Sequence, residues 1–247
     1  MEISQYLVIA SCAAVLIGMS KGGLPLVGMM SVPLLSLVMS PLKAVVLLLP
    51  IYVISDVVGV WLYRRNFSVV NLKILVPASI LGVLIGWFTA SMISDLAIKL
   101  IIGLVGVIFC VQTWFKLGQV DGALPASVTK GAFWGAVSGF TSFIAHAGGP
   151  PFQVFILPQK LPKAEFAGTA TILFAIINLA KIGPYQNLSP YSLEDLMNAF
   201  VLVPFALLGT FLGAYLTKRI AEAWFFKLVQ AGLFLVSLKL IWDAIKG

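Results

Sequence analysis

The chain has 247 residues, of which 60% are hydrophobic and only 10% charged, and its mean hydropathy is +1.06. Because a soluble domain carries roughly 25% charged residues, this composition excludes an ordinary water-soluble domain and predicts a protein whose surroundings are the lipid bilayer. The net charge of +7 is then a signal of membrane topology, so no nucleic-acid partner is expected.

Glycine, proline and charged residues divide the chain into apolar runs. Runs approaching roughly 20 residues cross a bilayer as helices, because a spanning segment must satisfy its own backbone hydrogen bonds. The first five predicted segments cover 3–18, 24–39, 42–63, 72–93 and 96–115. The next five cover 128–144, 152–157, 164–180, 196–216 and 224–245. The predicted fold class is an all-α polytopic membrane protein.

Three sequence patterns occur twice, in the same order. Gly-Gly-Leu-Pro at 22–25 recurs 126 residues later as Gly-Gly-Pro-Pro at 148–151. Leu-Lys-Ala at 42–44 recurs 120 residues later as Pro-Lys-Ala, and Leu-Val-Pro at 75–77 recurs 127 residues later. This nearly constant spacing predicts two copies of one unit. The predicted organisation is a first transmembrane repeat at 1–117, a cytoplasmic linker at 118–127 and a second transmembrane repeat at 128–247, all in one integrated membrane domain.

The charges in equivalent loops are opposite. Arg64-Arg65 follow the third segment of the first copy, whereas the equivalent loop, predicted at 184–195, contains no Lys or Arg and ends in Glu194-Asp195. By the positive-inside rule, equivalent loops lie on opposite sides of the membrane. We therefore predict two inverted-topology repeats of about four to five helical segments, each with a broken helix or hairpin whose tip is the Gly-Gly-x-Pro element.

These two tips are the predicted substrate site, since transporters with inverted repeats bind substrate where their broken helices meet. Pro25 and Pro151 are expected at the first position of the following helix. The N-terminus of that helix would present free N–H groups and a partial positive charge to an anion. Lys21 and His146 lie beside the tips and can add charge. The predicted substrate-binding residues are Ser20, Lys21, Gly22, Gly23, Thr141, Ser142, His146, Gly148, Gly149 and Gln153.

Structural roles compete with these assignments. Lys21 could instead extend to a membrane interface, and His146 could simply end its helix. Glycines spaced four apart are expected to pack helices against one another. They are Gly131, Gly135 and Gly139, the pair Gly82 and Gly86, and the pair Gly209 and Gly213. Both cysteines, Cys12 and Cys110, are expected to be small buried hydrophobic residues rather than a disulfide or a metal site.

Polar residues within the apolar segments are candidates for ion coupling. Asp56 could form a salt bridge with Lys21 or relay a proton or cation, and the sequence does not decide between these roles. His146 and Asn178 are the other coupling candidates, whereas Lys181 is expected to extend its ammonium to the interface. Thr169 and Thr171 either line the cavity or hydrogen-bond back to their own helix.

Other classes of function find no support in the sequence. The chain has no Gly-x-x-x-x-Gly-Lys-Ser/Thr phosphate loop, so ATP hydrolysis is not expected. No Cys, His or Asp cluster has the spacing of metal ligands, and the single histidine has no serine or cysteine partner for catalysis. We therefore expect neither an enzyme nor a cofactor nor a metal site.

The segments Gly-Met-Ser-Lys-Gly-Gly-Leu-Pro at 18–25 and His-Ala-Gly-Gly-Pro-Pro at 146–151 resemble the TauE/SafE family, the toluene-sulfonate uptake permeases. The length and the two-repeat layout fit this family too. The resemblance implies secondary transport of sulfite, or of an organosulfonate such as sulfoacetate, across a bacterial inner membrane. The related branch that imports thiosulfate uses cysteines in its pathway. Because Cys12 and Cys110 lie away from the tips, thiosulfate is not the expected substrate.

Two alternatives remain open at this stage: an anion channel on the same fold, and a membrane biogenesis factor that transports nothing. Coupled flux against a gradient would separate a transporter from a channel. The sequence leaves open the direction of transport, the choice between H⁺ and Na⁺ as coupling ion, and whether the chain forms a homodimer.

Overall fold

The computed structural model describes residues 3–22, 24, 27–90, 92–115, 123–219 and 222–246. None of these residues lies in a strand, so the predicted all-α fold is confirmed for them. The elements of the first half are α1 (Ile3–Lys21), η1 (Val27–Met30), α2 (Ser31–Leu35), α3 (Pro41–Tyr63), α4 (Val69–Ala90) and α5 (Asp95–Trp114). Those of the second half are α6 (Val128–Ala145), α7 (Gly149–Ile156), η2 (Leu157–Gln159), α8 (Lys163–Leu188), α9 (Leu193–Arg219) and α10 (Glu222–Lys246).

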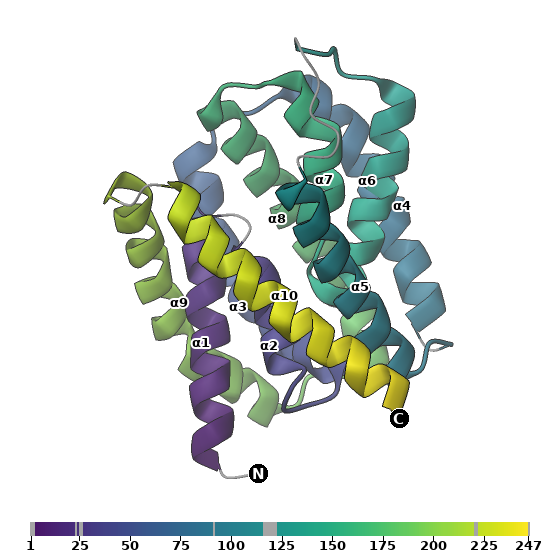
Figure 1. Cartoon of the computed structure of the whole chain (residues 1–247), viewed down its shortest axis with the longest axis vertical. Helices are drawn as coiled ribbons and strands as arrows, with labels where there is room; N and C mark the ends of the chain where they lie inside the picture. Colours follow the sequence, from purple (N-terminus) through teal and green to yellow (C-terminus); the bar gives the residue numbers. More distant parts are fainter. Residues whose placement is uncertain are drawn as a thin grey trace.

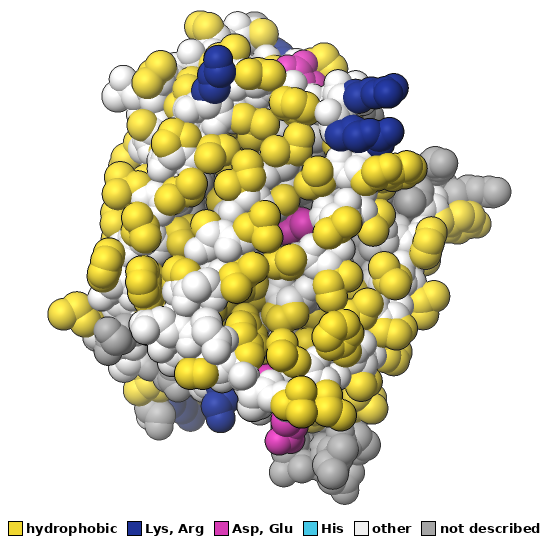
Figure 2. Space-filling view, turned by 180° about the vertical axis from the view of Figure 1, so that it is seen from behind, with side chains coloured by type: hydrophobic (Ala, Val, Ile, Leu, Met, Phe, Trp, Pro, Cys, Tyr) yellow, Lys and Arg dark blue, Asp and Glu magenta, His cyan; other side chains and the backbone are white. Residues whose placement is uncertain are grey.

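The outer surface is apolar, as a surface in contact with lipid must be. Among the described residues, five helices are long and apolar enough to cross a membrane, namely α3, α4, α5, α8 and α9. Large hydrophobic side chains such as Phe88, Phe200 and Phe211 point outward from these helices. Figure 2 shows such side chains covering most of one face, with Lys and Arg near its upper and lower edges. The chain is an integral membrane protein.

Each half opens with a helix that stops inside the molecule and a short helical segment that turns back. In Figure 1, α1 rises from the N-terminus to mid-height, while α6 starts near the opposite end of the molecule. After α1, the amide of Gly22 donates to Gly18 O (3.0 Å), and η1 and α2 follow. After α6, His146 takes a left-handed backbone conformation (φ 50°) that ends the helix, and α7 begins three residues later.

Glycines bring two pairs of helices into backbone contact. α4 packs against α6, where a Cβ on Gly82 would overlap the carbonyl of Ala136 and one on Gly139 would overlap that of Ser79. α1 packs against α9 in the same way, through Gly18, Gly209 and Gly213. The packing role predicted for Gly82, Gly139, Gly209 and Gly213 is confirmed, because side chains larger than hydrogen would hold the helices apart. Gly18 has the same role, although the sequence did not predict it.

The two interfaces correspond residue by residue. Gly209 faces Val15 O and Gly18 faces Ala206 O. Adding 121 to the α1 residues Val15 and Gly18 gives the α6 residues Ala136 and Gly139. Adding 127 to the α4 residues Ser79 and Gly82 gives the α9 residues Ala206 and Gly209. The contacts of one interface therefore recur in the other with the two halves of the chain exchanged.

A third pairing, between α5 and α10, shows the same exchange. Gly103 lies against Ser237 O, and Cys110 Sγ lies 3.4 Å from Gln230 O. Adding 127 converts Gly103 into Gln230 and Cys110 into Ser237, so the two contacts are equivalent. The helix α3 packs against α8, its counterpart in chain order.

We expect Gly139→Ala to lower the free energy of unfolding by about 1–3 kcal/mol, because the added methyl group meets the backbone of α4. Thermal unfolding in detergent measures this change. Ala132→Leu is the matched control, since residue 132 is exposed on the same helix and should change stability by less than about 0.5 kcal/mol. Equal stability of Gly139→Ala and the parent would show that α4 and α6 do not touch there.

Two sequence predictions need correction. The helix α8 does not end near Ala180: it continues through Pro184 to Leu188, so the loop predicted at 184–195 covers only 189–192. A transmembrane helix tolerates an internal proline when neighbouring groups satisfy the freed carbonyl. Cys12 is exposed on α1 rather than buried, whereas Cys110 is buried as predicted. The first half of the predicted linker at 118–127, residues 118–122, lies outside the described residues.

Candidate functional site

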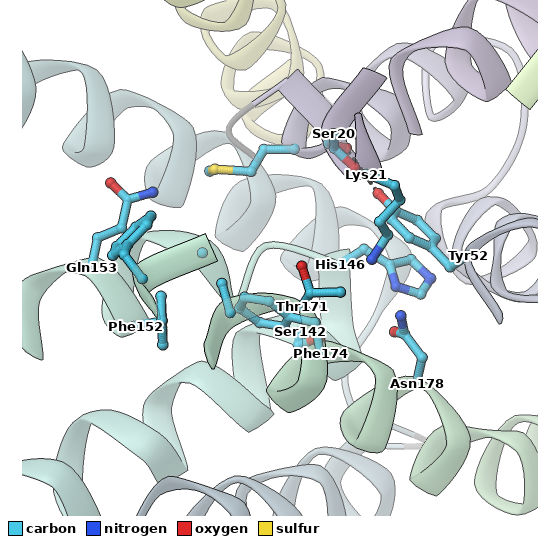
Figure 3. A pocket seen from close by; sticks show the side chains of 15 residues that line it. Ser20, Lys21, Tyr52, Ser142, His146, Phe152, Gln153, Thr171, Phe174 and Asn178 are labelled. Carbon is cyan, nitrogen blue, oxygen red and sulfur yellow. Dashed lines mark hydrogen bonds between the residues drawn. The ribbon is translucent and has the colours of Figure 1, made fainter. Parts of the chain in front are cut away.

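A cavity lies where the two interrupted helices approach α3 and α8 (Figure 3). About 70 Å³ of it is open to the centres of water-sized molecules. Since one water needs roughly 10–15 Å³ on this measure, the cavity has room for a small oxyanion. Its lining residues are Ser20, Lys21, Gly28, Met29, Tyr52, Ser142, His146, Gly149, Phe152, Gln153, Phe166, Ala170, Thr171, Phe174 and Asn178.

One side of the cavity holds a buried ion pair. Lys21 is 9% exposed and Asp56 4% exposed, and the ammonium of Lys21 donates to Asp56 Oδ1. Asn178 Nδ2 donates to the other carboxylate oxygen at 2.6 Å. The ammonium also lies 5.4 Å from the centre of the Tyr52 ring, where the π face favours a cation. Lys21 therefore does not extend to an interface, and of the roles open to Asp56 the salt bridge is formed.

A second buried cation lies behind the cavity wall. Lys181 is fully buried, and its Nζ donates to Ser142 O (3.1 Å), Ser142 Oγ (3.1 Å) and His146 Nδ1 (2.8 Å). The prediction that Lys181 reaches the interface is wrong. The side chain instead meets the C-terminal end of α6, where the last carbonyls carry partial negative charge.

His146 connects this cation to the cavity. Its Nε2 lies 2.9 Å from Val45 O, which can only accept, while Nδ1 meets the ammonium of Lys181, which can only donate. These partners fit the neutral ring with its proton on Nε2. The ring stacks on Tyr52, with centroids 4.5 Å apart. With Lys181 protonated and the ring neutral, the Lys181–His146 pair carries one positive charge.

The buried charges do not balance. Of the side chains that the structure describes, only Lys21, Lys181 and Asp56 are both buried and formally charged when His146 is neutral. Two positive charges and one negative charge leave an excess of one positive charge at the cavity. Lys181 has three hydrogen bonds but only neutral acceptors, so this excess is not compensated by a carboxylate.

The structure brings most of the predicted substrate-binding residues together. Ser20, Lys21, Ser142, His146, Gly149 and Gln153 line the cavity, as does the coupling candidate Asn178. In Figure 3, Gln153 and Phe152 lie at one end, and Lys21, Tyr52, His146 and Asn178 lie at the other. The cavity therefore has a charged end and an end rich in aromatic side chains.

The remaining predicted residues have other surroundings. Thr141 hydrogen-bonds back to Val137 O (2.9 Å) and does not line the cavity. Gly22 and Gly148 also lie outside the lining, and the Gly148 carbonyl accepts from Ser138 Oγ at 2.7 Å. Gly23 falls outside the described residues. Thr169 and Thr171 were each expected either to line the cavity or to hydrogen-bond to their own helix. Thr171 lines the cavity, whereas Thr169 donates to Glu165 O (2.7 Å).

The helix terminus at the second tip offers fewer donors than predicted. α7 begins at Gly149, so Pro150 and Pro151 occupy its second and third positions rather than Pro151 its first. Neither proline has an N–H, and the amide of Phe152 donates to Gly148 O (3.2 Å). Of the four amides at this helix start, only those of Gly148 and Gly149 remain as donors. Side-chain cations, more than the helix N-terminus, supply the positive charge here. Pro25, at the first tip, lies outside the described residues.

Sequence reasoning missed part of the lining. Tyr52 lies one helical turn before Asp56, a spacing that places both on one face of α3. On α8, Phe166, Ala170, Phe174 and Asn178 follow one another at intervals of four, and all line the cavity. This spacing of four is a signal in the sequence for the side of α8 that lines the cavity, because the polar Asn178 ends a stripe of otherwise apolar residues.

An apolar helical bundle with a charged internal cavity between two interrupted helices defines an integral membrane protein of the transporter class. The family model described as Sulfite exporter TauE/SafE matches residues 8–240, nearly the whole chain. The chain therefore belongs to the TauE/SafE family, whose members are membrane transporters of sulfur-containing anions. Searches of the curated proteins and of the solved structures found no match.

Proposed function

We propose that the protein is a secondary transporter that binds sulfite or an organosulfonate in the cavity between its two interrupted helices. The observation that carries this proposal is the uncompensated positive charge buried at the cavity. A buried charge without a counterion is costly, because the low-dielectric interior replaces the water that solvated it. An anion in the cavity would remove that cost.

Two donors support anion binding at the charged end. Lys21 lines the cavity and gives one of its three N–H donors to Asp56, so the others can reach a bound oxygen. Ser142 Oγ accepts from Lys181, which leaves its own hydrogen free to donate into the cavity. The charge of Lys181 strengthens that donation, since hydrogen bonds in a chain polarise one another.

The paired contacts of α1 with α9 and of α4 with α6 support two repeats, 1–117 and 128–247, of inverted topology. Exchanging the two halves of the chain maps one interface onto the other. In transporters built from inverted repeats, the two repeats can exchange conformations, which converts a state open to one side of the membrane into a state open to the other. The substrate site stays near the bilayer midplane throughout. We place the protein in the bacterial inner membrane on the family resemblance.

Binding can be tested by thermal unfolding of the detergent-purified protein with sulfite, methanesulfonate, taurine, sulfate and acetate. A ligand at 100 times its Kd stabilises the folded state by about 2.7 kcal/mol, so binding raises the melting temperature. We expect at least one sulfur oxyanion to do so and acetate to do so less. Absence of stabilisation by every sulfur anion would contradict the proposed function and favour a biogenesis factor.

The pair variant Lys21→Met/Asp56→Asn tests the site. Removing Lys21 alone would leave the Asp56 carboxylate buried and unpaired, at a cost of about 3–5 kcal/mol, so both charges are removed together. We expect affinity to fall at least about tenfold, equivalent to 1.4 kcal/mol. Lys239→Met/Asp243→Asn is the matched control, because it removes the same two charges from an exposed pair on α10. Parent-like affinity in the first variant would show that Lys21 does not contact the anion.

A further inference from the structure

We infer that the cavity is a monoanion site: it takes a sulfur oxyanion of charge −1 and discriminates against dianions such as sulfate or sulfoacetate. This inference rests on the proposed function and specifies the charge class of its substrate. It follows from the number of buried charges rather than from the shape of the cavity.

The count of formal charges determines what the cavity can neutralise. Lys21 and Asp56 cancel one another in a direct ion pair, and the Lys181–His146 pair contributes a single positive charge. A monoanion brings the buried total to zero. A dianion leaves a net charge of −1 that no described side chain compensates. An uncompensated buried charge costs several kcal/mol, which the dianion could avoid only by gaining a proton.

The residues that line the cavity also favour a monoanion over a dianion. Lys21, Ser142 and Asn178 supply donors toward the charged end, whereas Met29, Phe152, Phe166 and Phe174 make up the apolar part of the lining. Gln153 lies beside Phe152 at the other end (Figure 3). An oxygen that carries a second negative charge would lie among these apolar side chains, where the neutral amide of Gln153 offers a donor but no compensating charge. A methyl or larger apolar group in the same place would instead be in contact with side chains of its own kind. The pair methanesulfonate and sulfate tests the point directly, because they differ by a methyl group in place of one charged oxygen.

Asp56 provides a variant that should change the preferred charge. Asp56→Asn raises the buried excess from one to two positive charges. The new amide can still accept from Lys21 through its oxygen. Asn178 now donates to Asp56 Oδ2, and a flip of its own amide would let it accept from the new Nδ2. The network of hydrogen bonds therefore survives while the charge changes by one.

Isothermal titration calorimetry on the full chain in detergent, at constant pH and with sodium gluconate fixing the ionic strength, measures both anions. For the parent, we expect methanesulfonate to bind at least about tenfold more tightly than sulfate, a difference of 1.4 kcal/mol or more. In Asp56→Asn the ratio should move toward sulfate by at least about tenfold. Asp243→Asn, which removes an exposed carboxylate on α10, should leave the ratio unchanged.

A second variant keeps the inference testable if Asp56→Asn does not fold. Gln153→Glu, a change of nearly equal size in the cavity lining, adds a carboxylate and lowers the excess to zero, so methanesulfonate affinity should fall at least about tenfold. Sulfate binding as tightly as methanesulfonate in the parent would overturn the inference and leave the proposed function standing. If neither anion nor any other sulfur anion binds, the proposed function fails and the inference fails with it. An unchanged ratio in Asp56→Asn would show that the buried charge does not set the preference.

Discussion

Lys181→Met is expected to abolish anion binding while the protein stays folded. The substitution keeps a side chain of similar length and removes, among the side chains that the structure describes, the buried cation that is not hydrogen-bonded to a carboxylate. The cavity then holds only the Lys21–Asp56 pair, whose charges cancel, and its attraction for an anion disappears. We expect affinity for methanesulfonate to fall by at least about a hundredfold, equivalent to 2.8 kcal/mol.

Stability should change far less than affinity. The variant loses the hydrogen bonds from Nζ to Ser142 and His146, which costs about 1–3 kcal/mol for each buried acceptor left unpaired. Removing the buried charge also removes its desolvation penalty, which stabilises the variant by several kcal/mol and offsets the lost hydrogen bonds. Thermal unfolding without ligand measures the sum, and calorimetric titration measures the affinity. Lys239→Met, an exposed lysine on α10, is the control. Parent-like affinity in Lys181→Met would mean that the excess charge does not attract the substrate.

The buried position of Lys181 could not be predicted from the sequence. The tips at 22–25 and 148–151 were identified because a pattern repeated, and Lys21 and His146 stood beside it. Lys181 lies beside no repeated motif, and the segment predicted at 164–180 ends one residue before it. Only the continuation of α8 to Leu188 places Lys181 in the interior, opposite the end of α6.

Thr141 and Ser142 are a second case in which the sequence could not identify the residue that lines the cavity. Thr141 and Ser142 are adjacent in the sequence, and both were predicted to bind substrate. Adjacent residues on a helix point about 100° apart, so only one can face the cavity. Ser142 lines it, whereas Thr141 hydrogen-bonds to Val137 O. Choosing between them required the position of α8, which a single sequence does not provide. The fold class needed no such information, because composition alone excluded a soluble domain.

Proton coupling, one of the two coupling modes left open by the sequence, gives the Lys181–His146 pair a specific role. An empty carrier with an excess positive charge would have to carry that charge through its conformational change at high cost. Loss of one proton from the pair makes the empty carrier neutral, and binding of a proton with a monoanion makes the loaded carrier neutral too. Under proton coupling, both neutral forms would be able to change conformation, so the anion would move together with a proton. His146 is the member of the pair that lines the cavity and can pass the proton to it.

His146→Asn is expected to separate exchange from net transport. Few side chains suit this position, because residue 146 has φ 50° and asparagine tolerates that conformation better than glutamine does. The variant keeps a hydrogen-bonding side chain but has no titratable ring to take the proton from Lys181. The charges near the position are Lys181, Lys21 and Asp56, and the rings of Tyr52 and Tyr185 pack against His146.

In proteoliposomes, exchange of internal for external methanesulfonate requires only the loaded carrier, so His146→Asn should retain it within about threefold of the parent, a change below 1 kcal/mol in barrier height. Net uptake driven by a pH gradient requires the empty carrier to return, so it should fall at least about tenfold. Lys130→Gln, an exposed lysine at the start of α6, should leave both rates unchanged. Parent-like uptake by His146→Asn under a pH gradient would remove His146 from the coupling mechanism. If uptake by the parent ignores pH and follows a Na⁺ gradient, proton coupling is wrong, and Asp56, with Asn178 beside it, becomes the leading candidate for a cation ligand.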